Sequence, residues 1–310
     1  MQKLISCARD GALLVVRSDL AAATITGPDR VSWLNALLTQ DLSGMKPGHA
    51  VQGLALNKKG RVLCEAWAVA STDRLLLALD ATAQTALLEH FDHYLVMEDA
   101  EIAAASEPYV WVMAYGPLAS QAAEHYANAP GYVAGRVTHF GHPAVVFALP
   151  AQHAQTLIGD NASHTMDRVA VASLESFDAM RIDLGVMRFG VEFSESTYPE
   201  EAGLDAHAIS FNKGCYLGQE VVVKMKSRGH PSKKVVRLTA AGTSAFAAGD
   251  PVLNGAGEGT GTVSSSHVCH VLPGTVVAFA TVRMPDSQPG TVLKVADREA
   301  TVVGLQGLIG

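Results

Sequence analysis

Residues 211–220 have the sequence FNKGCYLGQE, which brings a thiol, a cation and two glycines into one short segment. Lys213 stands two residues before Cys215, and a nearby cation favours the thiolate form of a cysteine. A helix beginning at Tyr216 would add its dipole to the same effect. The sequence near Cys215 has no histidine paired with an aspartate or asparagine, which a catalytic cysteine nucleophile would need. The residues leave three interpretations open: a reactive thiol, a turn that holds a ligand, and a tight turn that requires small residues.

The next residues carry the densest group of basic side chains in an acidic protein of net charge -7. The group consists of Lys224, Lys226, Arg228, Lys233 and Lys234. One interpretation is an exposed helix end whose cations are favoured by the helix dipole. The other is a clamp for an anionic ligand tail or for RNA phosphates. The pattern favours neither.

A carboxylate after an apolar helical stretch is a further candidate. Asp183 follows Phe177 and Met180 at helical spacing. Such a carboxylate can accept two parallel N–H bonds from a planar heterocycle that carries an amino group. The alternative is an ordinary solvated carboxylate, and spacing alone favours it.

Apolar periodicity predicts two related α+β units before residue 229. In the first unit we expect a strand over 11–16, a helix within 24–41, a meander of three antiparallel strands over 51–80 and a helix over 81–95. In the second we expect a strand over 109–116, a helix over 117–128, a hairpin over 132–150 and a helix over 151–159.

The composition changes at about Lys233, where glycine and valine rise and helical periodicity ends. Short strands separated by Gly, Pro and Asn turns predict a small barrel or sandwich of about six strands. Gly229 and Pro231 break any helix in the expected linker. The predicted domains are therefore 1–228, with two interleaved subdomains, and 229–310.

Length and composition exclude several classes of protein. A chain of 310 residues with 48% apolar residues can form two to three domains with substantial cores. A pI of about 5.9 argues against a general nucleic-acid binder, so we expect no direct DNA binding. Absence of a signal peptide or a long apolar run predicts no membrane association. The four cysteines are scattered, which indicates a cytoplasmic protein. The sequence contains no cluster with the spacing of zinc ligands, so we expect no metal site.

The segment KGCYLGQE at 213–220 resembles the signature of the YgfZ-type folate-binding proteins, relatives of the glycine-cleavage T-protein, an aminomethyltransferase. Further blocks resemble the T-protein in the same order: ITGPDRVSWLNALLTQDL, LALNKKGRVL, MRIDLGV and YPEEAGL. The resemblance covers nearly the whole chain. It implies an α+β fold with two related folate-binding subdomains and a C-terminal β-barrel, arranged as a ring around the folate.

The resemblance also implies roles for single residues. Asp183 takes the position of the carboxylate that binds the pterin, and Asn57 and Glu201 fall in two further matching blocks and are counted as folate-binding. Lys226 and Arg228 would form a basic rim for the folate glutamate tail or for a partner.

Cys64 and Glu65 stand where the T-protein has two aspartates, one of which assists the transfer. The departure argues against T-protein catalysis, and Glu65 is the remaining candidate carboxylate in that block.

The function implied is that of a tetrahydrofolate-binding protein in the assembly or repair of iron–sulfur clusters of client enzymes, including tRNA-modifying ones. Cys215 would be the functional thiol and Lys213 its cationic neighbour, with contact to tRNA weak or indirect. The alternative is a tetrahydrofolate-dependent aminomethyltransferase or methyltransferase that uses Glu65. Whether the chain is an enzyme stays open.

Overall fold

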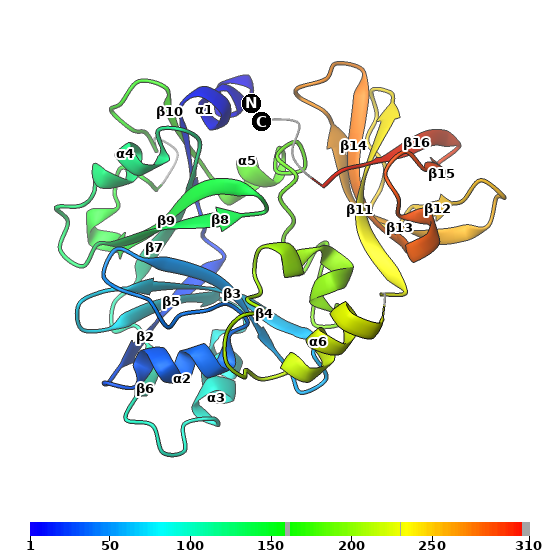
Figure 1. The fold of residues 1–310 in the computed structure, drawn as a ribbon. Coiled ribbons are helices and arrows are strands. Elements are labelled where there is room, and N and C mark those ends of the chain that lie inside the picture. Colours follow the sequence, from blue (N-terminus) through cyan, green and yellow to red (C-terminus); the bar gives the residue numbers. More distant parts are fainter. Residues whose placement is uncertain (159–161, 230, 306–310) are drawn as a thin grey trace.

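The computed structural model describes residues 1–158, 162–229 and 231–305, and it combines two five-stranded sheets with a closed β-barrel (Figure 1). Within these residues no helix has the length and apolar character needed to cross a membrane.

The first sheet has the strand order β3-β4-β5-β2-β6 and is antiparallel throughout. Its strands are β2 (Leu20–Thr26), β3 (Ala50–Leu56), β4 (Val62–Ala70), β5 (Leu75–Asp80) and β6 (Glu101–Ala104). Helices α2 (Arg30–Leu37) and α3 (Gln84–Asp92) cover one face. Because side chains alternate along a strand, Cys64 and Ala66 pack under these helices, while Glu65 and Trp67 point to the other face.

The second sheet has the order β10-β1-β7-β9-β8. Its strands are β1 (Ala12–Val16), β7 (Tyr109–Tyr115), β8 (Val133–His139), β9 (His142–Pro150) and β10 (Val169–Ala172), and the flanking helices are α1 (Gln2–Asp10) and α4 (Ala119–Glu124). Strand β1 precedes the whole first sheet in sequence, yet it pairs parallel with β10 and antiparallel with β7. The two sheets are therefore interleaved along the chain.

The two sheets meet along β3 and β8, where His49 and Arg136 form a parallel bridge. Gly135 permits this approach, because a Cβ atom there would lie 2.3 Å from the backbone nitrogen of Ala50. One apolar core is shared across the junction, with Trp67 from the first sheet and Trp111 from the second. Phe279 of the barrel joins the same core.

Residues between the second sheet and the barrel form short elements that pack on the shared core. They are α5 (Leu174–Asp178), the 3₁₀ turns η2 (Pro199–Ala202) and η3 (Leu204–Ala206), and α6 (Gln219–Arg228). The buried Glu192 accepts two hydrogen bonds from Arg181, at 2.8 and 2.9 Å, and one from Ser265 of the barrel at 2.5 Å. The hydrogen bond from Ser265 ties this segment to the barrel, and the ion pair with Arg181 holds Glu192 in place.

The barrel closes in the order β11-β14-β13-β12-β15-β16. Its strands are β11 (Lys233–Ala241), β12 (Pro251–Leu253), β13 (Gly259–Val268), β14 (Thr275–Arg283), β15 (Val292–Val295) and β16 (Arg298–Val303). Alternate residues such as Val236 and Leu238 fill its interior, whereas Val235 packs against the main body.

The predicted α+β class, the three-strand meander and a six-stranded barrel are confirmed. The helix expected over 151–159 is wrong within the described residues, since only the single turn η1 (Ala151–His153) forms there. The helix expected from Tyr216 begins at Gln219, because Gly218 adopts a left-handed conformation with φ 83°. Helix α1 was not anticipated. The domain boundary at 228/229 stays a prediction.

Candidate functional site

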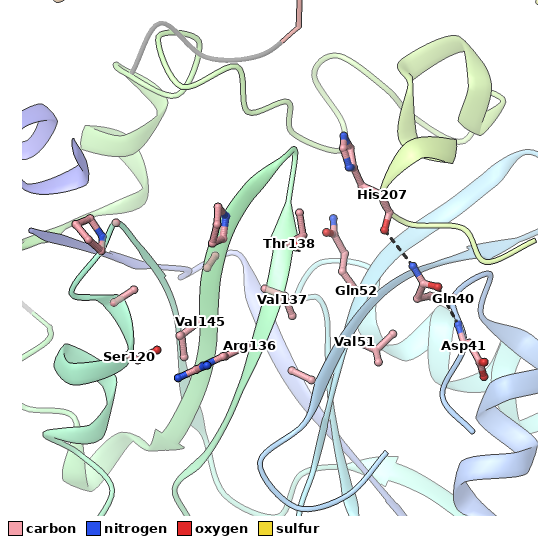
Figure 2. A pocket seen from close by; sticks show the side chains of 16 residues that line it. Gln40, Asp41, Val51, Gln52, Ser120, Arg136, Val137, Thr138, Val145 and His207 are labelled. Atoms are coloured by element: carbon pink, nitrogen blue, oxygen red, sulfur yellow. Dashed lines mark hydrogen bonds between the residues drawn. The ribbon is translucent and has the colours of Figure 1, made fainter. Parts of the chain in front are cut away.

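A cavity of about 770 Å³ lies where the two sheets meet (Figure 2). Strand β3 and strand β8 form two of its walls, and the loop that carries His207 lies above them. Valines 51, 137 and 145 supply apolar surface. The polar lining comes from Gln40, Asp41, Gln52, Ser120, Arg136, Thr138 and His207. This volume and mixture of groups are typical of sites for organic ligands.

A chain of buried polar groups runs from this cavity across the sheet junction. Gln52 lines the cavity, and its side-chain nitrogen donates to Glu65 Oε1 at 2.5 Å. The same oxygen lies 3.7 Å from His139 Nε2, and His139 Nδ1 hydrogen-bonds the Tyr115 hydroxyl at 2.6 Å. Among the described residues, the side-chain oxygen of Gln52 has no hydrogen-bond partner. An unused buried acceptor of this kind favours a ligand that donates an N–H.

Burial decides the charge of the neighbouring groups. It lowers the pKa of His139, against the opposing pull of Glu65, so the imidazole is neutral at pH 7. Burial also raises the pKa of Cys64 to about 12, which leaves a neutral thiol. Cys64 points under α2 and α3, away from the face that Glu65 occupies. The pair Cys64–Glu65 therefore offers a single carboxylate at the junction.

Lys213 is committed to the end of a helix. Its ammonium donates to the carbonyl oxygens of Asn35, Leu38 and Gln40 at 2.5, 2.8 and 2.7 Å. These are the terminal acceptors of α2 and its following loop, which a helix leaves unpaired. The same loop carries Gln40, whose side chain donates to the His207 carbonyl at 3.1 Å in the cavity wall. Lys213 thus fixes one wall of the cavity.

Cys215 is the exposed thiol, whereas Cys7, Cys64 and Cys269 are buried, as the sequence predicts. It lies between Gly214 and the buried Tyr216, three residues before the N-cap of α6. The Lys213 ammonium donates to carbonyl oxygens at the end of α2. Its predicted role as the cationic neighbour of the Cys215 thiol therefore stays a prediction.

Asp183 lies away from the cavity, at the contact between the segment after α5 and the barrel. It is fully buried, and its carboxylate accepts from His270 Nδ1 at 3.0 Å and from the His270 backbone nitrogen at 3.3 Å. The next residue, Leu184, accepts from His142 Nε2 at 2.6 Å. His142 begins β9, next to Pro143 in the cavity wall.

The remaining predicted residues lie in α6 or near it. Asn57 accepts from the backbone nitrogens of Lys59 and Arg61 and shapes the β3–β4 turn. Glu201 accepts from the Tyr198 nitrogen at 3.0 Å, and Lys226 lies over the Phe211 ring. The side chain of Arg228 lies outside what the structure describes. None of the predicted site residues is among the described lining of the 770 Å³ cavity.

Sequence reasoning missed Gln52, Arg136 and His139. A usable signal existed for the first, because Gln52 and Glu65 occupy inward positions of two adjacent strands, where apolar residues are expected. His139 gave a weaker signal as a polar residue at the buried end of β8. Arg136 could not be distinguished from any exposed strand residue.

Comparison with known proteins finds similarity over nearly the whole chain. Residues 5–130 match the family model described as the GCVT N-terminal domain. A tRNA-modifying protein YgfZ from Yersinia enterocolitica is 25% identical, covering 99% of this chain and 95% of that protein. A mitochondrial aminomethyltransferase from Flaveria pringlei is 24% identical, covering 98% and 80%. The chain is related to the YgfZ proteins and to the aminomethyltransferases.

A solved structure agrees on the fold. The glycine cleavage system aminomethyltransferase T from Bartonella henselae superposes with a TM-score of 0.81 at 21% identity, over 99% of this chain and 89% of that one. The shared fold therefore includes the barrel as well as the two sheets.

Proposed function

We propose that this chain binds a reduced folate, such as tetrahydrofolate, and uses it in the assembly or repair of iron–sulfur clusters of cytoplasmic client enzymes, including tRNA-modifying ones. The observation that carries the proposal is the near-full-length relationship to proteins named for tRNA modification and for aminomethyl transfer. A cavity large enough for a folate at the junction of the two sheets supports it.

The residues of the cavity fit such a ligand. The valine surfaces suit a planar ring system, and the free Gln52 oxygen can accept from a folate N–H. The guanidinium of Arg136 can pair with the carboxylates of the glutamate tail. When bound, tetrahydrofolate supplies the nitrogen atoms that carry a one-carbon unit. The sequence-based roles of Asp183, Asn57, Glu201, Lys226 and Arg228 stay predictions, as does that of Cys215.

Aminomethyl transfer is the second candidate, favoured by the buried contact between Glu65 and His139. Two features weigh against it. Glu65 already accepts from Gln52, and Cys64 is neutral and faces the opposite side of the sheet. Electrostatic catalysis requires a charge aimed at the reacting group. We therefore prefer a folate-binding role in the assembly or repair of iron–sulfur clusters over transferase activity.

Calorimetry with tetrahydrofolate tests the binding step. We expect saturable binding by the full chain and a loss of roughly tenfold in affinity for Gln52→Leu and for Arg136→Gln, since each removes one polar contact. Arg283→Gln, an exposed arginine on the barrel, is the matched control and should bind as the parent protein does. Absence of heat at millimolar tetrahydrofolate contradicts the proposal, and unchanged variants contradict the placement in this cavity.

Two activity measurements separate the candidates. In cells that lack their own YgfZ-type protein, this chain should restore the activity of an iron–sulfur tRNA-modifying enzyme, and Gln52→Leu should reduce that rescue. An assay of aminomethyl transfer to tetrahydrofolate should give turnover far below the ~1 s⁻¹ of an ordinary enzyme. Turnover at that rate without rescue would support the transferase.

A further inference from the structure

Three side chains of types that bind metals meet where the main body contacts the barrel. Asp183 comes from the segment after α5, His267 from β13 and His270 from the turn that follows β13. Asp183 Oδ1 lies 3.1 Å from His267 Nε2, and Asp183 Oδ2 lies 3.0 Å from His270 Nδ1. One ligand atom from each residue lies within 4.8 Å of the others.

The hydrogen bonding of this cluster is incomplete. Asp183 is fully buried, and its Oδ1 lies 3.1 Å from His267 Nε2, but the two atoms lack hydrogen-bond geometry and Oδ1 has no other hydrogen-bond partner among the described residues. Within the same part of the chain, neither ring nitrogen of His267 makes a hydrogen bond. Buried polar groups in folded proteins are normally hydrogen-bonded, so a close pair without hydrogen-bond geometry favours a cation that both atoms would contact. The His267 and His270 side chains are 14% and 28% exposed, which leaves access from solvent.

We propose that Asp183, His267 and His270 bind one divalent transition-metal ion, with zinc as the reference ion. Two imidazoles and one carboxylate are donors that zinc takes in proteins, and the remaining position is left for water or another ligand. Metal–ligand bonds of about 2.0–2.2 Å place tetrahedral ligand atoms roughly 3.3–3.5 Å apart. The observed separations of 3.0 and 3.1 Å need to widen by only a few tenths of an ångström.

An opposing charge comes from Arg237 on β11. Its guanidinium is buried and interacts electrostatically with Asp183, and its Nε and Nη1 have no hydrogen-bond partner in the part of the chain that the structure describes. A positive charge that interacts with Asp183 weakens the binding of a metal cation to the same carboxylate. Arg237→Met should therefore tighten zinc binding. If the three residues only connect the barrel to the main body, neither the parent nor this variant should bind zinc.

Sequence spacing could not predict this site. The two histidines are three residues apart, but Asp183 lies 87 positions before His270 and is joined to them only by the contact between body and barrel. The inference does not rest on folate binding. It does give Asp183 a ligand other than the pterin, so zinc and a pterin bound at Asp183 would compete.

The test is a zinc titration of the full chain, made without a histidine tag and stripped with a chelator. We expect one zinc ion per chain, measured by competition with a chromogenic chelator, with a dissociation constant below about 10 µM. His267→Gln and His270→Gln should each weaken binding at least ~100-fold, beyond the 10–100-fold typical of residues that only support a ligand. His153→Gln, an exposed histidine outside the cluster, should bind as the parent does.

Cobalt gives a second readout that does not depend on affinity alone. Co²⁺ bound by the three residues should show visible absorption of a low-coordinate site, and either histidine substitution should abolish the band. Thermal melting of the metal-free variants checks that they fold. Equal zinc binding by the parent and the His267→Gln, His270→Gln double variant overturns the proposal, as does the absence of stoichiometric binding by the parent.

Discussion

The ammonium nitrogen of Lys213 lies 2.8 Å from the carbonyl oxygen of Leu38, although the two residues are 175 positions apart in the chain. Helix α2 ends one residue before Leu38, so the lysine satisfies acceptors that the helix cannot. This contact gives the lysine of the KGCYLGQE segment a structural task and connects that segment to the cavity wall.

Replacement of Lys213 by methionine should destabilise the protein. Three partly buried carbonyls would lose a charged donor, and we expect a decrease in unfolding free energy of roughly 2–4 kcal/mol. Urea denaturation measures the change. Lys224→Met is the matched control, because Lys224 is exposed and forms a surface ion pair with Glu220, so the cost of this substitution should stay within about 0.5 kcal/mol. Equal midpoints for the two variants would contradict the assignment.

Glu200 should make stability depend on pH. Burial raises the pKa of Glu200 to about 7, with further contributions from the charges of Asp205 and Glu201. The folded state then holds a proton that the unfolded state releases near pH 4.5. This contribution is fully present below about pH 4.5 and is lost as the pH rises through about 7, by up to roughly 3 kcal/mol.

Glu200→Gln should therefore be more stable than the parent at pH 8 and should lack the decline between pH 5 and 7. Urea midpoints at several pH values measure this difference. Glu195→Gln, which changes an exposed glutamate of the same region, serves as control and should keep the parental profile. A parallel decline in both variants would assign the pH dependence to other groups.

Asp183→Asn tests the pterin role that the family resemblance implies. If Asp183 binds the pterin, the substitution should lower tetrahydrofolate affinity by roughly ten- to a hundredfold, because one charged hydrogen-bond pair contributes about 1.5–3 kcal/mol. A folate held in the cavity at Gln52 and Arg136, whose described lining does not include Asp183, should keep its affinity. Calorimetry in excess chelator keeps the metal out of the measurement. Addition of zinc to the parent protein should weaken folate binding if both ligands use Asp183. Unchanged tetrahydrofolate affinity in Asp183→Asn would exclude Asp183 from the folate site and leave its contacts with His267 and His270 as its role.

Cys215 should be the first cysteine to react. It is exposed, whereas the other three thiols are buried, and burial raises the pKa of Cys7, Cys64 and Cys269. Limited alkylation near neutral pH with peptide mapping should label Cys215 in the native protein and all four cysteines in urea. Cys215→Ser should keep its folate affinity and lose cellular rescue. Full rescue by the serine variant would reduce Cys215 to a small residue in a tight turn.

Local patterns predicted the elements well. The β3–β4 turn was predictable because Asn57 accepts from the two backbone nitrogens that follow it, a contact contained within five residues. The barrel strands were predictable for the same reason, since turn residues separate short apolar runs. Helix α1 was missed because its apolar positions Ile5 and Ala8 are few and its ends carry no side-chain cap.

The candidate site was predictable only in part. Exposure of Cys215 and burial of Cys64 follow from their local surroundings. The partners of Lys213 and Asp183 do not, because Asn35 and His270 lie 178 and 87 positions away and are brought close by packing between elements. Gln52 is the intermediate case, since its inward position could be read from strand alternation but its contact with Glu65 required the register of β3 and β4.

The parallel pairing of β1 with β10 has a consequence for the order of events on the ribosome. Strands β2 to β6 are contiguous from Leu20 to Ala104, so the first sheet can assemble while the rest of the chain is still being made. The apolar strand β1 leaves the exit tunnel before them, yet its neighbours β7 and β10 are synthesised much later. During that interval it is an unpaired, aggregation-prone segment, which makes residues 12–16 the expected contact point for a nascent-chain chaperone.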